Sequence, residues 1–509
     1  MNHIYKFFLL FNLIVLQANT QESIQAKIID SISQNPIPFA TISTTKNAGV
    51  ISNSNGNFLI YINKKEHKKD SLFIRCLGYE TKRYLIKNFA DSLVTLSPKS
   101  IELNEVLVSN KNYTAEEVII KTKEHLQDNY DYSFTKSRLF FRASYFANVL
   151  KNEVKIKKTT IPEFNQQFID SLLVAMPKDS DDYTEILADI YGKSGNRDEQ
   201  KLDIIKASHL YDKSKEVSFK SYEEKFNTII KKRVKRDSYF KIKSGWFGTK
   251  QEIDSSLFEN GNQKKVEESE AIIAQKKKQE AKRKKNFLKY RKSSISQLQH
   301  NSFIFKDSYL NFLEKPNKYD YKIEDYSFLN NNFVYIISFT PKRKEDFKGT
   351  IYINTDDFAI VRLDYENVKT LKKFNLLGLS FNQNLKKGTL IYSKNNTNKY
   401  ALKYADVEES TRFGFKRPIA IIEKNKHTKG RRKQNELSSD VHFIITNRHK
   451  NELVIFDNES ISEIDYKNFA EKPKVKPVYL AKYDPEFWKG YNVIEPNQAI
   501  KEFKSIEKK

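Results

Sequence analysis

Apolar and polar residues alternate in short segments along two parts of the chain, and this pattern predicts a mainly β protein. Between residues 24 and 96 the segments are separated by frequent turn signals, such as Asn55-Gly56. Asn-Gly favours a tight hairpin turn because both residues tolerate a positive φ. Short strands at this spacing are typical of a β-sandwich. We therefore predict a seven-stranded-type β-sandwich over residues 22–97.

A longer run of strand-like segments fills residues 301–509, including NFVYIISFTP, FKGTIYI and GTLIYS. Consecutive strands joined by short breaks form an antiparallel meander. This region is therefore expected to be a larger antiparallel sheet or incomplete barrel with helices, which makes the fold mainly β with α+β character. The aromatic C-terminal segment, with Phe487, Trp488 and Tyr491, is expected to seal one end of the sheet.

Residues 98–130 predict a connecting strand followed by an amphipathic helix. Thr114 and Glu117 have the spacing of a capping box, in which each side chain satisfies a backbone N–H at the helix N-terminus. Residues 131–261 have a mixed α/β pattern. In that region TEILADIYG and DEQKLDIIKASHLYD suggest helices, and DSYFKIKSGWFGTK suggests an ordered turn or loop against the core.

The first 20 residues have the layout of a secretory signal peptide. Lys6 precedes an apolar run from Phe7 to Leu16, and Ala18 and Thr20 are small residues placed as a cleavage site requires. The run is about half of the ~20 residues needed to cross a bilayer. No cysteine follows it directly, so no lipoprotein anchor is expected. We predict an exported protein, periplasmic or outer-membrane-associated, with no transmembrane helix in the mature chain.

The succession PIPFATI, GVISNSNGNFLI and SLFIRCLGYET resembles the carboxypeptidase regulatory-like domain, a transthyretin-like β-sandwich of exported Bacteroidetes proteins. The matching positions are Pro38 to Ile42, the turn from Asn53 to Phe58, and Gly78-Tyr79. The remainder, with FFR at 140–142 and the terminal YDPEFWKGYNVI, resembles uncharacterised envelope proteins that carry this domain. The resemblance implies a fold and a place in the envelope. It implies no activity, because the domain is an accessory module.

The formal net charge of +25 is concentrated in part in a basic segment, which we expect to be an exposed helix or insertion over residues 262–300. An exported protein rarely meets nucleic acid, so the expected partners are an anionic lipid surface, a glycan or an envelope protein. The candidate contacts with an anionic surface are Lys276, Lys277, Lys278, Lys282, Arg283, Lys284 and Lys285.

No catalytic residue, cofactor or metal is expected. A zinc carboxypeptidase needs two His and a carboxylate that converge on the metal, but the only HxxE pair, His449 and Glu452, has no histidine after it. The HExxH, GxSxG and GxxxxGK motifs are absent. We therefore predict that the protein is not an enzyme. A hydrolase with a site assembled from scattered residues is kept as a further alternative.

The leading hypothesis is a non-catalytic binding or scaffolding protein of the cell envelope. The alternative is a periplasmic carrier in which a half-barrel holds a lipid or other apolar ligand. Its expected ligand face comprises Phe333, Tyr335, Ile337, Ile351, Ile353, Leu390 and Tyr392. The only cysteine, Cys76, lies with Leu72 and Ile74 on one side of a strand-like segment, so we expect it to be inert core.

Overall fold

The computed structural model describes residues 22–45, 49–62, 70–99, 113–253, 268–329, 332–427 and 432–505. The expected signal peptide and most of the expected connecting strand after residue 98 lie outside these residues. Within the described ranges, no helix is both long and apolar enough to cross a membrane.

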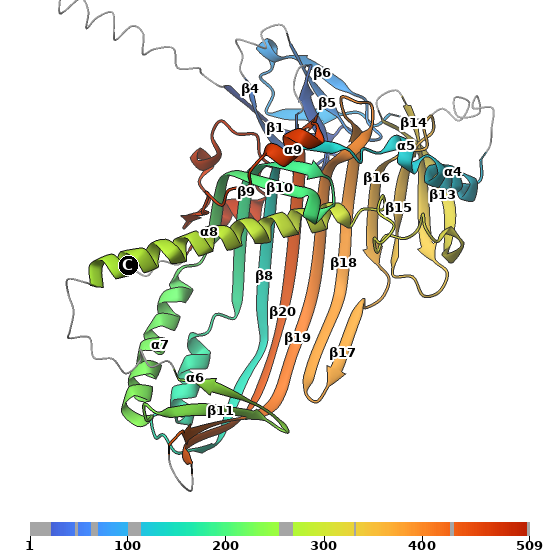
Figure 1. Ribbon diagram of the computed structural model, residues 1–509. Coiled ribbons are helices and arrows are strands. Elements are labelled where there is room, and N and C mark those ends of the chain that lie inside the picture. The colour runs from blue at the N-terminus through green and yellow to red at the C-terminus, as the bar shows by residue number, and fades with distance from the viewer. Residues whose placement is uncertain are drawn as a thin grey trace, which may run out of the picture.

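The N-terminal residues form the predicted seven-stranded β-sandwich (Figure 1). One sheet contains β4 (Asn57–Ile62), β1 (Glu22–Asp30) and β7 (Leu93–Leu96). The other contains β3 (Val50–Ile51), β2 (Thr41–Thr44), β5 (Ser71–Arg75) and β6 (Lys82–Leu85). Leu72 and Ile74 of β5 are buried in its core, as expected. Cys76 follows β5 and packs against the same cluster while remaining partly exposed.

A single open sheet of 14 strands forms the body of the molecule. Along the sheet the strands follow in the order β13 (Tyr319–Leu329), β14 (Asn332–Pro341), β15 (Phe347–Asn354), β16 (Ile360–Asn367), β18 (Leu379–Lys394), β19 (Tyr400–Asn425), β20 (Lys433–Ser460), β8 (Phe134–Thr159), β9 (Asp179–Lys193), β10 (Gln200–Tyr211) and β21 (Val478–Leu480). β17 (Lys372–Leu376) pairs with β18, and β11 (Ser238–Ser244) pairs with β19 and with β12 (Phe247–Glu252). Strands from residues 131–261 and from residues 301–509, which were expected to form separate regions, therefore belong to the same sheet.

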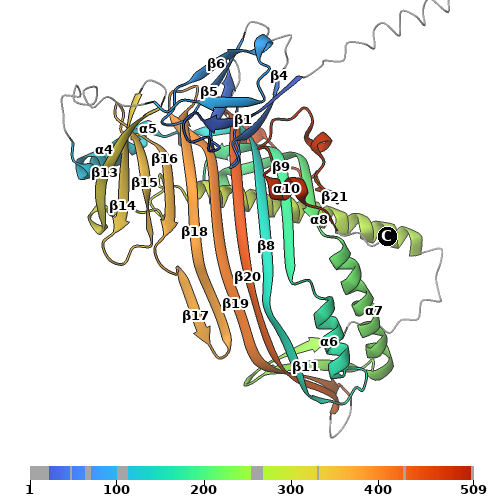
Figure 2. The ribbon, with the colours of Figure 1, turned by 180° about the vertical axis from the view of Figure 1, so that it is seen from behind.

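Both faces of the sheet are covered in the half nearer the sandwich (Figures 1 and 2). One face packs against α4 (Ala115–Glu124), α5 (Leu126–Asn129), the second half of α8 (Glu268–His300) and residues 303–313. The opposite face packs against the sandwich and residues 487–494. The other helices are α6 (Gln166–Ala175), α7 (Ser214–Arg233), α9 (Glu463–Asn468) and α10 (Gln498–Glu502), with short 3-10 turns at Ile86–Asn88, Arg197–Glu199, Pro316–Lys318 and Pro485–Trp488.

The capping box at the start of α4 is confirmed. The Glu117 carboxylate accepts from the Thr114 backbone N–H at 2.8 Å, and the Thr114 hydroxyl accepts from the Glu117 N–H at 3.2 Å. The expected apolar stripe of this helix is buried against β13 and its neighbours. The C-terminal aromatic segment packs against the sheet, where Trp488 meets Phe140 with ring centroids 5.4 Å apart.

Two segments expected to be helices are strands. TEILADIYG belongs to β9 and DEQKLDIIKASHLYD largely to β10, and the two strands pair antiparallel. The residues from Tyr183 to Ile190 are all buried because protein covers both faces of β9 here. A strand buried on both faces has no alternation of apolar and polar residues, so its sequence cannot be told from a helix by periodicity.

The DSYFKIKSGWFGTK segment is not a loop, and only its first part is packed, where Phe240 meets a small cluster with Ile230 and Val234. It forms the β11–β12 hairpin, in which every residue of β12 is exposed. β11 pairs with the far end of β19, beyond the last residue at which β18 pairs with it. The hairpin therefore extends the sheet at the end remote from the sandwich.

Candidate functional site

The face expected to hold a ligand is occupied by protein. Tyr335, Ile337, Ile351, Ile353, Leu390 and Tyr392 are all buried in one cluster with side chains of α4, α8 and residues 303–313. Phe333 is half-buried and packs against Phe328, with ring centroids 4.5 Å apart. These positions lie in the half of the sheet that helices cover, which their apolar periodicity could not reveal.

The basic residues expected to contact an anionic surface lie on the first half of α8, which projects past the edge of the sheet (Figure 1). Lys277, Lys278, Lys282, Arg283 and Lys285 are exposed. Lys284 is half-buried and pairs with Glu280 at 3.3 Å, and the Lys276 side chain lies outside the described ones. One side of the second half of the helix is buried, because Leu288, Ile295 and Leu298 join the core.

An open apolar face lies on the half of the sheet remote from the sandwich. The strand register places Phe374, Phe381, Phe413, Ile445 and Val149 in one row across five neighbouring strands. The next row contains Leu376, Leu379, Phe415 and Phe443. Farther from the sandwich on the same side of the sheet, Val441 of β20 pairs with Val154 of β8. We call these eleven residues the apolar face.

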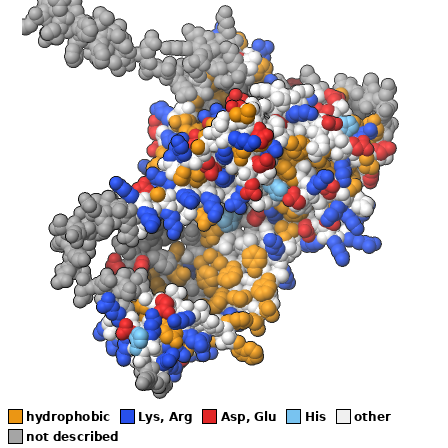
Figure 3. Space-filling model, viewed as in Figure 1, with side chains coloured by type: hydrophobic (Ala, Val, Ile, Leu, Met, Phe, Trp, Pro, Cys, Tyr) orange, Lys and Arg blue, Asp and Glu red, His pale blue; other side chains and the backbone are white. Residues whose placement is uncertain are grey.

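The apolar face is on the same side of the sheet as α8, but α8 does not cover it. None of its residues belongs to the hydrophobic clusters formed by the described part of the chain. Phe374, Leu376 and Phe413 are exposed and the other eight are half-buried. Figure 3 shows hydrophobic side chains gathered in a hollow below α8. Contiguous exposed apolar surface of this kind marks a ligand groove or an interaction site.

Alternation along the strands explains why only one side is apolar. Arg412, Lys416 and His442 are each next to an apolar-face residue in the chain, and period two places them on the opposite side of the sheet. The FNL, LSFN and RFGFK patterns each show alternating apolar residues on one strand. The residues of the first row, however, are spread over positions 149, 374, 381, 413 and 445. No single stretch of sequence shows that they meet.

Two polar rows border the apolar face on the α8 side. One contains Lys372, Gln383, Thr411 and Asn447, and the next contains Lys386, Glu409, His449, Tyr145 and Asp182. Lys386 pairs with Glu409 at 2.8 Å, and the Tyr145 hydroxyl donates to Asn447 Oδ1 at 2.6 Å. Rows on one face are about 6.6 Å apart, so the first apolar row lies about 13 Å from the second polar row.

Arg291, on the face of α8 that meets the sheet, has no anionic partner among the described residues. Leu288, Arg291, Ile295 and Leu298 form the stripe of α8 that faces the sheet, since they recur at helical spacing and the three apolar ones are buried. Nε of Arg291 is buried and has no hydrogen-bond partner among the described residues, which also offer it no ion pair within 4 Å. Burial lowers the pKa of Arg291, and the charge of Asp182 partly opposes this effect.

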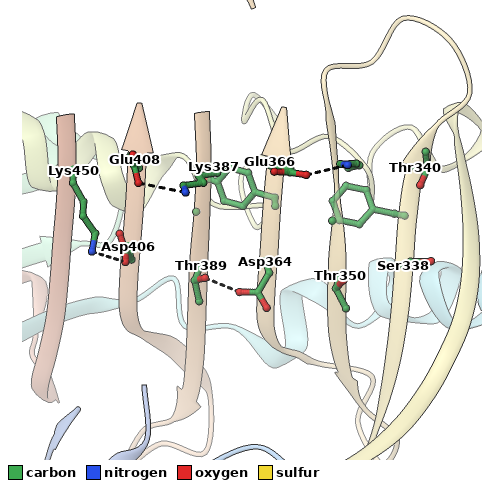
Figure 4. Close-up of a pocket in the computed structure, with 15 residues that line it drawn as sticks. Ser338, Thr340, Thr350, Asp364, Glu366, Lys387, Thr389, Asp406, Glu408 and Lys450 are labelled. Atoms are coloured by element: carbon green, nitrogen blue, oxygen red, sulfur yellow. Dashed lines mark hydrogen bonds and ion pairs between the residues drawn. The ribbon is translucent and has the colours of Figure 1, made fainter. Parts of the chain in front are cut away.

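The opposite side of the sheet holds a polar groove of about 650 Å³ (Figure 4). Its charged side chains neutralise one another: Lys348 pairs with Glu366 at 2.9 Å, Lys387 with Glu408 at 3.5 Å and Lys450 with Asp406 at 3.1 Å. Thr389 also donates to Asp364 at 2.6 Å. Because the cations lining the groove have carboxylates of their own, no unmatched charge points to a ligand here.

The structure brings together no set of metal ligands in the described ranges. His449 and Glu452 are three residues apart on β20, so they project from opposite faces of the sheet. The ring of His449 packs on Tyr145, and burial lowers its pKa. Glu452 lies near Arg142 within the sheet, with 3.7 Å between Oε2 and Nη1. The one HxxE pair therefore cannot chelate one ion.

Comparison with known proteins identifies the N-terminal domain. Residues 24–108 match the family model described as CarboxypepD_reg-like domain, which confirms the resemblance for this part of the chain. No curated protein matches the chain.

Similar solved structures were also found. One is a DUF1329 family protein from Desulfovibrio piger, at 9% identity and TM-score 0.17, covering 65% of this chain and 93% of that one. Another is MucB in complex with MucA(peri), at 6% identity and TM-score 0.14, covering 64% and 92%. The MucA/MucB complex of Pseudomonas aeruginosa gives 4% identity and TM-score 0.14, covering 64% and 93%. At these TM-scores the similarity supports no functional conclusion.

Proposed function

We propose that this protein is a non-catalytic binding protein of the bacterial cell envelope that holds an amphiphile with an anionic head and an apolar chain. The observation that carries the proposal is the apolar face, which the described residues leave open. Completing the burial of a Phe or Leu side chain stabilises a complex by about 1.5–3 kcal/mol at most, and several lie side by side here. An apolar chain laid on this face would gain a part of that energy at each contact.

The dimensions favour an acyl chain. From Asn447 in the first polar row to Val441, the last apolar-face residue on β20, the strand advances by six residues, about 20 Å at 3.3 Å per residue. A single acyl layer is about half of the ~30 Å hydrocarbon core of a bilayer, or about 15 Å. An extended chain would therefore fit along the strands within this length.

The charges favour an anionic head. Arg291 is a partly desolvated cation without a described anionic partner, and a carboxylate or phosphate suits a guanidinium because it accepts two parallel N–H bonds. Lys372 of the first polar row adds an exposed cation on the same side of the sheet. The head would lie on the polar rows beneath α8, and the chain would extend over the apolar face.

Native mass spectrometry of the protein purified from its own host tests the proposal. We expect a bound mass that organic extraction releases as a fatty acid or an anionic lipid. The proposal is wrong if the folded protein consistently carries no such mass and also fails to take up fatty acid when it is offered. A protein bound to the apolar face in place of a lipid would equally contradict it.

A further inference from the structure

Two hairpin tips at the end of the molecule remote from the sandwich present large apolar side chains to solvent. Between β11 and β12, Trp246 is 103% exposed and Phe247 is 62% exposed. At the turn between β17 and β18, Leu376 is 56% and Leu377 is 61% exposed. We call these four residues the tip surface. No large apolar side chain in the described ranges is more exposed than Trp246.

Arg417 joins the two tips into one surface. Its guanidinium donates to the carbonyl of Leu377 at 2.7 Å, and to the hydroxyl and the carbonyl of Ser244, each at 2.7 Å. Cζ of Arg417 also lies 5.4 Å from the centroid of the Phe247 ring. The two tips therefore lie side by side, as Figures 1 and 2 also show.

The turns place bulky apolar residues where polar or small ones are normal. Leu377 has φ +51° and Gly378 has φ +78°, the pattern of a type I′ turn that usually holds Asn-Gly. A leucine is disfavoured in this left-handed region because its Cβ crowds the backbone. In the other turn Gly245 has φ +60° and takes the left-handed position, leaving Trp246 at the apex. Neither apolar residue is needed to form its turn.

The surroundings of the tip surface are cationic. Residues 239–251, which contain the β11–β12 turn, carry three Lys and no acidic residue. Lys243 of this hairpin is exposed, as are Lys372 and Lys373 of β17 and Lys416 of β19, whereas Lys250 is exposed but pairs with Glu252 at 2.5 Å. Exposed apolar side chains with lysines nearby are complementary to a layer that has an apolar interior and anionic groups at its surface.

We propose that the tip surface docks on an anionic phospholipid bilayer. Trp, Phe and Leu side chains at the tips enter the boundary between headgroups and acyl chains, while the lysines face the anionic headgroups. This inference goes beyond the binding of an amphiphile and does not depend on it, since Leu376 is the only tip residue that also belongs to the apolar face, and the substitutions that test docking change Trp246 and Leu377 alone. The docking residues are also distinct from the basic residues on the first half of α8.

Vesicle binding followed by tryptophan fluorescence tests the docking. The chain has two tryptophans, and Trp488 is buried, so acrylamide quenching reports chiefly on Trp246. We expect vesicles of phosphatidylcholine with phosphatidylglycerol to shift the emission to the blue and to protect Trp246 from acrylamide. Vesicles of phosphatidylcholine alone should do so much more weakly.

The combined substitutions Trp246→Ser and Leu377→Asn should lower vesicle affinity, measured by co-sedimentation, at least about tenfold. Asn suits the backbone at 377 better than Leu, so folding is retained. Ile32→Ser, at an 80% exposed apolar residue of the sandwich, is the matched control and should change affinity less than about twofold. Replacing the α8 cations by Gln should likewise retain most of the vesicle affinity. The positions replaced are Lys277, Lys278, Lys282 and Arg283.

Three results would overturn the docking. The first is that the wild-type protein does not bind vesicles that contain phosphatidylglycerol. The second is that the doubly substituted protein binds them with the same affinity as the wild type. The third is that the substitutions at the tips abolish a dimer in solution, which would show that a second copy of the chain covers this surface. Fatty-acid binding measured without vesicles is a separate readout, so the two proposals can fail independently.

Discussion

Arg142 Nε donates a 2.7 Å hydrogen bond to Glu185 Oε1, and both side chains are buried within the large sheet. Arg142 Nη2 also donates to the carbonyl of Ile494 at 2.7 Å, and Trp488 Nε1 donates to Glu185 Oε2 at 2.8 Å. The pair therefore fastens the C-terminal segment to the sheet beside the sandwich.

Removing one partner of this pair should destabilise the fold strongly. Arg142→Ala leaves the Glu185 carboxylate buried without its main cation, which typically costs about 3–5 kcal/mol. Urea denaturation followed by the fluorescence of Trp488 would measure the loss. Replacing both residues by apolar ones of similar size should cost less than the single change. A loss below about 1 kcal/mol for Arg142→Ala would show that the charges are not desolvated.

Asp406 should make stability depend on pH. Burial, and secondly the charge of Glu452, raise the pKa of Asp406 to about 6. The folded protein then holds this proton more tightly than the unfolded chain, whose Asp titrates near pH 4. The contribution of Asp406 to stability is therefore largest below about pH 4 and falls as pH rises to about 6.

Asp406→Asn removes this titration. The free energy of unfolding of the variant, relative to that of the wild type, should rise by about 2 kcal/mol between pH 4 and pH 7. Urea denaturation at several pH values measures the difference, and Asp440→Asn on the half-buried part of β20 serves as a control. A constant difference across this range would show that Asp406 titrates normally.

Cys76 should react slowly with thiol reagents. Burial is the main cause that raises the pKa of Cys76 to about 11, so little thiolate exists at neutral pH. Compared with a free thiol of pKa about 8.5, the thiolate fraction falls about 300-fold. Labelling with a chromogenic disulfide should therefore be far slower in the folded protein than in urea. Equal rates would mean that the thiol is accessible and ordinary.

The sandwich and α4 could be predicted from sequence because their signals are local. Asn55-Gly56 and the Thr114–Glu117 box each act within a few residues, and both parts of the fold are confirmed. The prediction of a helix at β9 is wrong because protein covers both faces of this strand. The prediction of a ligand face at Ile337 and Ile351 rests on period two. That pattern shows which side chains share a face of the sheet but not what covers the face.

The apolar face could not be predicted because it is assembled across the chain. Val149 lies far from Phe381, Phe413 and Ile445 in sequence, and only the register of β8, β20, β19 and β18 brings them into one row. Arg291 was hidden among the many cations of its segment. Its position on the buried stripe of α8 distinguishes it, and that position depends on how the helix lies on the sheet.

Arg291 should determine the preference for an anionic head. Arg291→Gln keeps a polar side chain of similar length but removes the charge, so binding of a fatty acid should weaken about tenfold while binding of the matching fatty alcohol changes little. Lys289→Gln, at an exposed position of the same helix, is the control. Equal losses for the acid and the alcohol would indicate a structural role for Arg291 and no contact with the head.

The most direct test of the amphiphile proposal compares two neighbours on β19, Phe413 on the apolar face and Arg412 on the opposite side. Titration of the full chain with a fluorescent fatty acid, without vesicles, should give saturable binding. Phe413→Asn should weaken it about tenfold, and Arg412→Asn should change it less than about twofold. No saturable binding by the wild type, or equal effects of the two substitutions, would contradict the proposal that the open apolar face holds the ligand.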